Sequence, residues 1–463
     1  MSTLRIPPGP PPVKNPFAIM RLYSETKRDL LGLVARWFHE YGDMVKLEIM
    51  GDRQYVMAHP DHLHEVLVTK ADKFHKDRDY TDPHRGLARF LGNGLLTSDG
   101  EFWKRQRRLA APAFHSKRIA AYADTMVGVT RKMLDRWTDN AELDFNDEMM
   151  RTTLEIVTKA LFHTDVSEEA SRIGNAVTVL QHMSSEGANL LALLLPYWLP
   201  TPQRLREARA VRDLDEIVYS LIAERREAGT PDLGDLLSML MLARDEDGSH
   251  MSDKQLRDET VTIFLAGHET TANTLNWAFY LLTQNPEVEA KLHHELDTVL
   301  QGQPPTLEDL KRLPYTEMVI KESMRLYPPA YGVGRLAIED TTIGGYDVPK
   351  GTSIGIFTYF THRDPRWWDN PEAFIPERFS PENEPNIRRY AYLPFGAGPR
   401  VCIGNSFAMM EAQIMLATIA QRYELRLAPG QRVEPEPLIT LRPKGGLRMI
   451  ARERQTVPTV FAT

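Results

Sequence analysis

The segment Phe395-Gly396-Ala397-Gly398-Pro399-Arg400-Val401-Cys402-Ile403-Gly404 contains Cys402, the only cysteine in a chain of 463 residues. A lone thiol forms no intrachain disulfide, so packing, nucleophilicity and metal binding are its candidate roles. Free cysteines are most often small buried hydrophobic residues. Packing alone does not require so many glycines, whereas glycine lets a flat ligand approach the backbone closely. The run after Gly404 has the pattern of a helix, and a position just ahead of a helix N-terminus favours a thiolate.

A thiolate beside an arginine in such a loop suggests a metal held by one sulfur atom. Structural zinc requires four ligands and iron–sulfur clusters require several cysteines, so both fit this chain poorly. Haem is different, because the porphyrin supplies four nitrogens and the protein needs to give only one axial ligand. The haem propionates would then engage Arg400.

Residues 395–404 resemble the haem-binding loop of the cytochrome P450 family, because they match the pattern F-G-x-G-x-R-x-C-x-G at every fixed position. Three further motifs of the family occur in the expected order, so the resemblance covers nearly the whole chain. It implies haem b with the Cys402 thiolate as axial ligand, and Phe395, Arg400 and Gly404 beside the cofactor. It also implies a single domain over residues 1–463, mainly α with a small β-rich lobe, with the haem between a long central helix and the helix after the cysteine loop.

Composition narrows the class of protein further. Apolar residues make up 42% of the chain, and the net charge of −7 argues against a nucleic-acid partner. A single cysteine fits a reducing compartment, and residues 1–12 contain no apolar stretch, so we expect a cytoplasmic protein without signal peptide or transmembrane anchor. The apolar run 189–200 is too short for the roughly 20 residues of a membrane span. It predicts either a buried helix end or a lid over an access channel for an apolar substrate.

Sequence patterns predict a mostly helical chain with short strands near both ends. The runs 45–49 and 54–58 have the pattern of two strands, and 61–68 that of a helix. From about residue 101 to about 300 the patterns are mainly helical. Strands are predicted again at 342–348, 353–358, 424–427, 439–443 and 447–451, around a loop-rich stretch at 361–399 and a helix that ends near Arg422.

The hexapeptide Ala266-Gly267-His268-Glu269-Thr270-Thr271 lies in an apolar helical run and resembles the oxygen-activating motif of the family's central helix. The small Ala266-Gly267 pair allows a flat group to lie against the helix. We expect the Thr270 hydroxyl to bond the Ala266 carbonyl four residues back. Glu269 and Thr270 form an acid–alcohol pair that suits the delivery of protons to oxygen. His268 is not expected to bind iron, because sulfur and oxygen take the two axial sites.

Two other motifs of the family are present. Glu322 and Arg325 match E-x-x-R, where an acid and a base three residues apart can pair on one helix face. Together with Arg378 in the Pro-Glu-Arg-Phe segment, they are expected to shape the haem pocket and to take no part in turnover. An ordinary surface ion pair is the alternative.

Trp103 and Arg107 match W-x-x-x-R, which the family places beside the haem propionates. Arginine suits this role because its guanidinium binds carboxylates in bidentate geometry. Arg335 resembles another propionate-binding position, and a surface arginine at a strand edge is the alternative. The neighbouring Lys104, Arg105 and Arg108 are expected to face solvent, where they could also receive an acidic electron donor.

These motifs predict a haem-dependent monooxygenase that consumes O₂, two electrons and two protons. Electrons would come from a separate ferredoxin, flavodoxin or flavin reductase, or from a reductase outside this chain. Long-chain fatty acid or alkane hydroxylation is the leading expectation, with terpenoids, steroids and xenobiotics left open. Substrate-facing candidates are all apolar, and they are Leu96, Leu265, Ala266, Ala330 and Val333.

Three other functions compete with this interpretation. A haem-thiolate peroxygenase would use hydrogen peroxide, which arrives already reduced, and the presence of Glu269 and Thr270 argues against it. A haem sensor or carrier would bind the cofactor without turnover. A helical interaction protein would bind no cofactor and would be colourless when purified.

Overall fold

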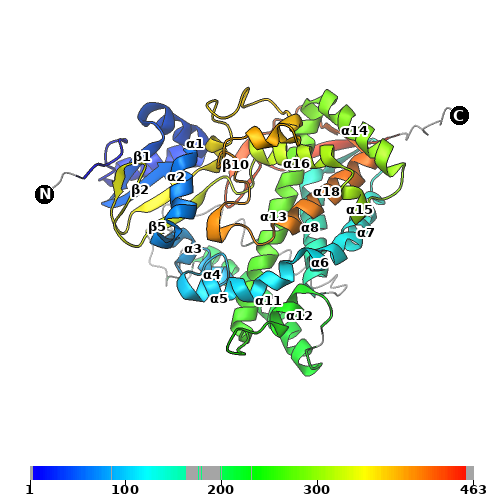
Figure 1. Cartoon of the computed structure of the whole chain (residues 1–463), viewed down its shortest axis with the longest axis horizontal. Helices are drawn as coiled ribbons and strands as arrows, with labels where there is room; N and C mark the ends of the chain where they lie inside the picture. The colour runs from blue at the N-terminus through cyan, green and yellow to red at the C-terminus, as the bar shows by residue number, and fades with distance from the viewer. Residues whose placement is uncertain are drawn as a thin grey trace.

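The computed structural model describes residues 4–84, 86–162, 201–230 and 232–454, together with the isolated positions 176, 179 and 199. The apolar run 189–200, apart from Leu199, lies outside these residues. Helices dominate and the strands form small sheets, which confirms the predicted mainly α class (Figure 1).

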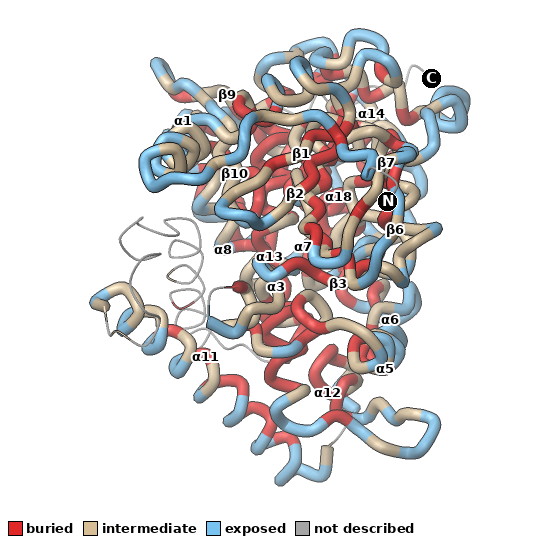
Figure 2. Tube along the Cα trace, turned by 90° about the vertical axis from the view of Figure 1, so that its left-hand side faces the viewer, coloured by how far each residue is buried: buried red, intermediate tan, exposed pale blue. Residues whose placement is uncertain are grey.

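The helical body is built around α13 (Asp253–Gln284), a helix of 32 residues that begins with a capping box between Ser252 and Gln255. At 1.5 Å per residue it is about 48 Å long. It packs against α8, α11, α16 and α18 and crosses the middle of the molecule (Figure 1). Most of its residues are buried, as the red tube in Figure 2 shows. The long helices of this body are α7 (Ala123–Leu134), α8 (Phe145–Phe162), α11 (Pro202–Glu227), α14 (Pro286–Leu300), α16 (Pro314–Leu326) and α18 (Asn405–Arg422).

Shorter helices connect these elements or cover their ends. They are α2 (Pro60–His64), α3 (Arg78–Thr81), α4 (Ala88–Leu91), α5 (Gly100–Ala110), α6 (Ser116–Ile119), α12 (Leu236–Leu242), α15 (Leu307–Leu310) and α17 (Thr358–Thr361). The predicted helix at 61–68 is α2 followed by a π-helical turn at Glu65–Thr69.

A five-stranded mixed sheet forms most of the β-rich lobe, with the strand order β1-β2-β8-β5-β3. Its strands are β1 (Met44–Ile49), β2 (Asp52–Met57), β3 (Phe74–Lys76), β5 (Val333–Ala337) and β8 (Ser353–Ile356). The pairing of β2 with β8 is parallel and the others are antiparallel. The lobe lies beside the helical body, with α1 (Pro16–Tyr41) next to β1 and β2 (Figure 1).

Three smaller sheets complete the fold. The antiparallel sheet β4-β12-β9 joins β4 (Ala141–Asp144), β12 (Arg448–Glu453) and β9 (Tyr423–Leu427), and two hairpins pair β6 (Thr341–Ile343) with β7 (Tyr346–Val348) and β10 (Pro435–Pro437) with β11 (Leu441–Pro443). No helix in the described part of the chain is long and apolar enough to cross a bilayer.

Candidate functional site

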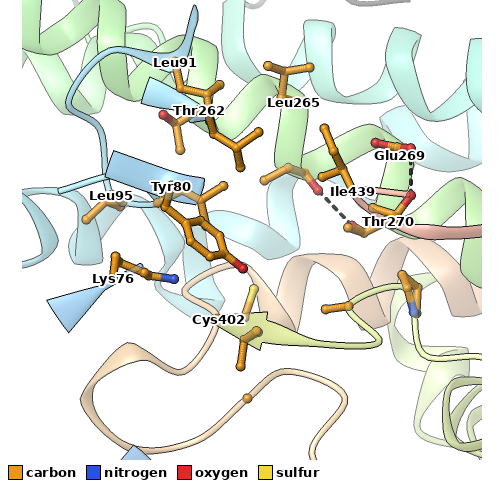
Figure 3. Close-up of a pocket in the computed structure, with 18 of the residues that line it drawn as sticks. Lys76, Tyr80, Leu91, Leu95, Thr262, Leu265, Glu269, Thr270, Cys402 and Ile439 are labelled. Carbon is orange, nitrogen blue, oxygen red and sulfur yellow. Dashed lines mark hydrogen bonds between the residues drawn. The ribbon is translucent and has the colours of Figure 1, made fainter. Parts of the chain in front are cut away.

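A cavity of about 1260 Å³ lies between the cysteine loop and α13. Figure 3 shows Cys402 on one side of it, and Leu265, Glu269 and Thr270 of α13 on the opposite side. Every residue predicted for the cofactor, for catalysis or for substrate contact lines this cavity: Leu96, Trp103, Arg107, Leu265, Ala266, Glu269, Thr270, Ala330, Val333, Arg335, Phe395, Arg400, Cys402 and Gly404.

The loop that carries Cys402 depends on glycine at one close approach. Gly398 has φ +67°, and a Cβ atom there would lie 1.9 Å from the carbonyl oxygen of Leu67. The loop is closed by the Cys402 amide, which donates to the Phe395 carbonyl at 2.9 Å. The thiol faces the cavity and the following helix, α18, begins at Asn405. Burial raises the pKa of Cys402, while the Gly404 amide and the Arg107 guanidinium favour the thiolate to a smaller extent.

Buried and partly buried cations gather at the β-rich side of the cavity. Arg400 contacts the ring of Trp103 at 4.1 Å, donates to the Ser98 carbonyl at 3.0 Å and pairs with Asp99. Burial lowers the pKa of Arg400 to about 10 in spite of this pair. Arg335 is buried and donates to the Gly334 carbonyl at 2.8 Å. Burial lowers the pKa of Arg335 as well, so its side chain is not the surface arginine of the alternative interpretation.

Lys76 belongs to the same cluster, and sequence reasoning missed it. It lies on β3, directly opposite Arg335 of β5. Among the described residues its ammonium meets the ring of Tyr80 at 4.5 Å and no carboxylate (Figure 3). Burial and the nearby Arg335 and Arg400 hold the pKa of Lys76 well below its usual range. Only the β3–β5 register brings this lysine to the cavity, and no local motif marks it.

The donor set of this cavity fits haem. A single thiol faces the cavity from a glycine-rich loop. Two buried cations, Lys76 and Arg335, and the partly buried Arg400 lie near one carboxylate, that of Asp99. Buried charges need partners of opposite sign. A flat macrocycle with two propionates would supply two carboxylates and would take the Cys402 sulfur as its protein ligand.

On α13, the Thr270 hydroxyl donates to the Ala266 carbonyl at 2.8 Å, as the spacing predicts (Figure 3). Glu269 accepts a hydrogen bond of 2.7 Å from the Thr440 hydroxyl. His268 is buried, with Nδ1 3.2 Å from the Phe264 carbonyl, and burial lowers its pKa to about 4. Close packing of α13 against α8 also requires a small residue at position 267, because a Cβ atom on Gly267 would lie 2.9 Å from the side chain of Val157.

Glu322 and Arg325 do not line the cavity and are fully buried beside it. Two hydrogen bonds of 2.7 and 2.8 Å join their side chains. Arg325 also donates to the carbonyls of His362, Pro371 and Ala373, so all five of its N–H groups have acceptors. Arg378 donates to Glu322 at 3.3 Å. These contacts exclude the surface ion pair that was the alternative.

His362 connects this network to the cysteine loop, and no motif in the sequence marks it. Its Nε2 accepts the amide of Leu393, two residues before Phe395, at 2.8 Å. Burial lowers the pKa of His362 to about 3, so the ring is neutral. The position of the loop is thereby tied to the buried pair.

The basic run on α5 is only partly solvated. Lys104 is exposed and lies 2.6 Å from Glu101. Arg105 and Arg108, in contrast, both bind Asp245 in the segment between α12 and α13, at 2.8 and 2.5 Å. The expectation that all three face solvent is therefore wrong for Arg105, because its guanidinium stabilises this interhelical segment.

The sequence model described as Cytochrome P450 matches residues 7–448. The chain is 38% identical to cyclooctatin synthase of Streptomyces melanosporofaciens, over 89% of both chains. It is 37% identical to pentalenene oxygenase of Streptomyces avermitilis, over 87% of this chain and 88% of that protein.

Two solved structures are similar over 98% of this chain. The cytochrome P450DA heme domain is 27% identical with a TM-score of 0.87 and is covered over 99% of its length. Retinoic acid bound cyanobacterial CYP120A1 is 25% identical with a TM-score of 0.86 and is covered completely. With the thiol, the cation cluster and the central helix in place, these likenesses assign the chain to the cytochrome P450 family, as a monooxygenase of hydrophobic substrates that binds haem b through the thiolate of Cys402.

Proposed function

We propose that this enzyme hydroxylates a terpene-type molecule in the cavity between Cys402 and α13. The cavity suits a hydrophobic substrate, because Leu96, Leu265, Ala330 and Val333 line it with aliphatic side chains. Relatives that are 37% and 38% identical carry the names pentalenene oxygenase and cyclooctat-9-en-7-ol 5-monooxygenase, and both named molecules are terpene-type compounds.

A long-chain fatty acid or alkane is the second candidate. The cavity wall includes Arg89 of α4 and Arg204 of α11, far along the chain from the cysteine loop. Arg89 lies 2.6 Å from Glu207 and Arg204 donates to the Leu199 carbonyl at 3.0 Å, so a substrate carboxylate would bind these guanidinium groups as an additional acceptor. This observation favours the fatty acid over the alkane.

When bound, haem would supply the iron for the activation of O₂ with two electrons. We assign Arg400, Arg335, Trp103 and Lys76 to its propionates, because two buried cations and the partly buried Arg400 lie around a single carboxylate. Arg107 lies near Cys402 and favours the thiolate. Phe395 and Gly404 flank the cysteine at the two ends of the loop.

Glu269 and Thr270 are the proposed source of the two protons. This acid–alcohol pair faces the cavity across from Cys402, and that placement is the observation on which the monooxygenase mechanism depends. The backbone bond to Ala266 holds the Thr270 hydroxyl on the cavity side of α13. A peroxygenase would not need this pair, and a sensor would not need protons at all.

Electrons come from a redox partner, and we propose a separate ferredoxin, flavodoxin or flavin reductase, or a reductase outside this chain. The exposed Lys104 suits an acidic donor. The cytoplasmic location stays a prediction from the sequence.

Spectral titration of the haem-loaded enzyme tests the substrate class. Pentalenene should displace the iron-bound water and shift the Soret band at lower concentration than palmitic acid. The reverse order would favour the fatty acid.

Thr270→Ala and Glu269→Gln test the proposed delivery of protons. Each variant should release hydrogen peroxide in place of hydroxylated product. Full coupling in both variants would reject the proposed relay.

A further inference from the structure

We infer that Thr440, outside the family motifs found in the sequence, is a positioning residue that orients Glu269 for proton delivery. This inference rests on the proposed role of Glu269. Its basis is a chain of buried hydrogen bonds that runs along α13 and reaches Glu269 from the C-terminal β10–β11 hairpin.

The hydrogen bonds on either side of Thr440 are both donated in the direction of Glu269. Asn273 Nδ2 donates to Thr440 Oγ1 at 3.0 Å, and Thr440 Oγ1 donates to Glu269 Oε1 at 2.7 Å. A hydroxyl has a single proton to give. Because the Asn273 amide occupies a lone pair of the hydroxyl oxygen, that proton is directed to Glu269. The Oε1 atom of Glu269 must then act as an acceptor, so a proton carried by this carboxyl sits on Oε2.

Further amides continue the chain away from the cavity. Asn276 Nδ2 lies 3.5 Å from Asn273 Oδ1 and 2.8 Å from Asn146 Oδ1 of α8. Glu269, Asn273 and Asn276 are spaced at i, i+4 and i+7 and therefore share one face of α13. All three are buried, as is Thr440 at 6% exposure, so these bonds are shielded from water. Hydrogen bonds in such surroundings are stronger and polarise one another.

The hairpin that carries Thr440 is itself held in place. Trp277 Nε1 of α13 donates to the Leu441 carbonyl at 2.9 Å, and the Tyr331 hydroxyl donates to the Leu438 carbonyl at 2.8 Å. The Leu441 amide donates to the Pro329 carbonyl at 3.0 Å. Contacts on both sides of Thr440 thus fix the hydroxyl relative to α13. A hydroxyl on a loose loop could not restrict the rotamer of Glu269.

The test uses the haem-loaded enzyme with Thr440→Val, which keeps the shape and removes the hydroxyl, and Thr440→Ser, which keeps the hydroxyl. Thr130→Val is the matched control, because its buried hydroxyl bonds the Met126 carbonyl on α7. The infrared bands of the Glu269 carboxyl are isolated by difference against Glu269→Gln. They should shift in Thr440→Val, return in Thr440→Ser and stay unchanged in Thr130→Val.

The second readout is the ratio of hydroxylated product to hydrogen peroxide. Electrons are supplied by a plant-type ferredoxin and its reductase. The substrate is whichever of pentalenene and palmitic acid binds more tightly. This ratio should fall by up to about tenfold in Thr440→Val, the factor for one ordinary hydrogen bond, with unchanged affinity for the substrate. Unshifted bands, or full coupling in Thr440→Val beside an uncoupled Glu269→Gln, would overturn the inference alone. Full coupling in Glu269→Gln as well would overturn the proposed relay and the inference together.

Discussion

Lys76 and Arg335 face each other directly across the β3–β5 ladder, and both are buried. Like charges placed directly opposite each other destabilise a sheet. Their arrangement is therefore unfavourable for the protein alone and would become favourable with the carboxylates of the cofactor nearby. Asp99 is the one carboxylate of the described residues that acts on both cations, so the fold leaves this cluster with an excess of positive charge.

Lys76→Met should stabilise the haem-free protein and weaken retention of haem. Haem transfer to apomyoglobin should be faster by about tenfold, the factor for one charge-assisted hydrogen bond. Lys73→Met is the control, because Lys73 is partly exposed and pairs with Glu339 at 3.0 Å. Equal rates in the two variants would contradict the role of Lys76.

The same substitution has a pH signature in the haem-free protein. Because the folded state lowers the pKa of Lys76 below its ordinary value of 10.5, the unfolded chain binds more protons than the folded one between the two values. Stability should therefore rise with pH over that range. Urea unfolding of the haem-free protein should show a smaller rise in Lys76→Met.

Arg325→Ala should give mostly haem-free or unfolded protein. Removal of one partner from a buried ion pair costs about 3–5 kcal/mol, because the other charge is left unmatched. Arg325→Lys should rescue little, since an ammonium offers three donors where the guanidinium makes five bonds. Haem content is measured from the reduced carbon monoxide spectrum. Arg312→Ala, which breaks an exposed pair with Asp309, should leave that spectrum unchanged.

Gly398→Ala should damage the cysteine loop more than Gly396→Ala. Both glycines have positive φ, +67° and +73°, and such a conformation costs an alanine about 1–2 kcal/mol. At Gly398 the new Cβ would also meet the Leu67 carbonyl at 1.9 Å, whereas at Gly396 it would meet nothing within 4 Å. Thermal unfolding and haem content should both fall further in Gly398→Ala. Identical losses would show that backbone conformation alone matters.

Glu411→Gln should change how stability depends on pH. Glu411 of α18 is fully buried, and burial raises its pKa to about 8, with the Thr271 hydroxyl offsetting a small part. Between about pH 4.5 and 8 the folded state keeps a proton that the unfolded chain releases, so stability should fall as pH rises through this range.

Urea unfolding from pH 5 to 8 should show a shallower fall in Glu411→Gln than in the parent protein. Part of the fall should remain, because burial also raises the pKa of Glu259 to about 8. The exposed Glu287→Gln on α14 is the control and should follow the parent curve. A curve for Glu411→Gln that coincides with the parent would show that Glu411 finds a partner in solution.

Local spacing made part of this molecule predictable. The helix that begins after Gly404, the bond from Thr270 to Ala266 and the pairing of Glu322 with Arg325 all depend on residues within one or two turns of each other. Short strands at 45–49 and 54–58 were also predictable, because β1 and β2 form a simple hairpin. The mainly α fold was predictable from the helical patterns between about residues 101 and 300, and the resemblance of the motifs implies the same fold.

Long-range pairings were not predictable. Helix α1 was not expected, nor were β3 and β5, whose register places Lys76 at the cavity. His362 and Thr440 reach the site through contacts that join distant parts of the chain. A single lysine, histidine or threonine has no pattern of its own, so only the tertiary structure shows which of many equivalent residues takes part.

The β10–β11 hairpin gives two neighbouring residues separate tasks. Both residues line the cavity, but Ile439 has 39% of its surface exposed, whereas Thr440 is buried and donates to Glu269. Engineers could therefore vary position 439 to change the shape available to a ligand and leave proton supply intact. Inserting or deleting one residue in this hairpin would displace both side chains, and selectivity and efficiency would change together.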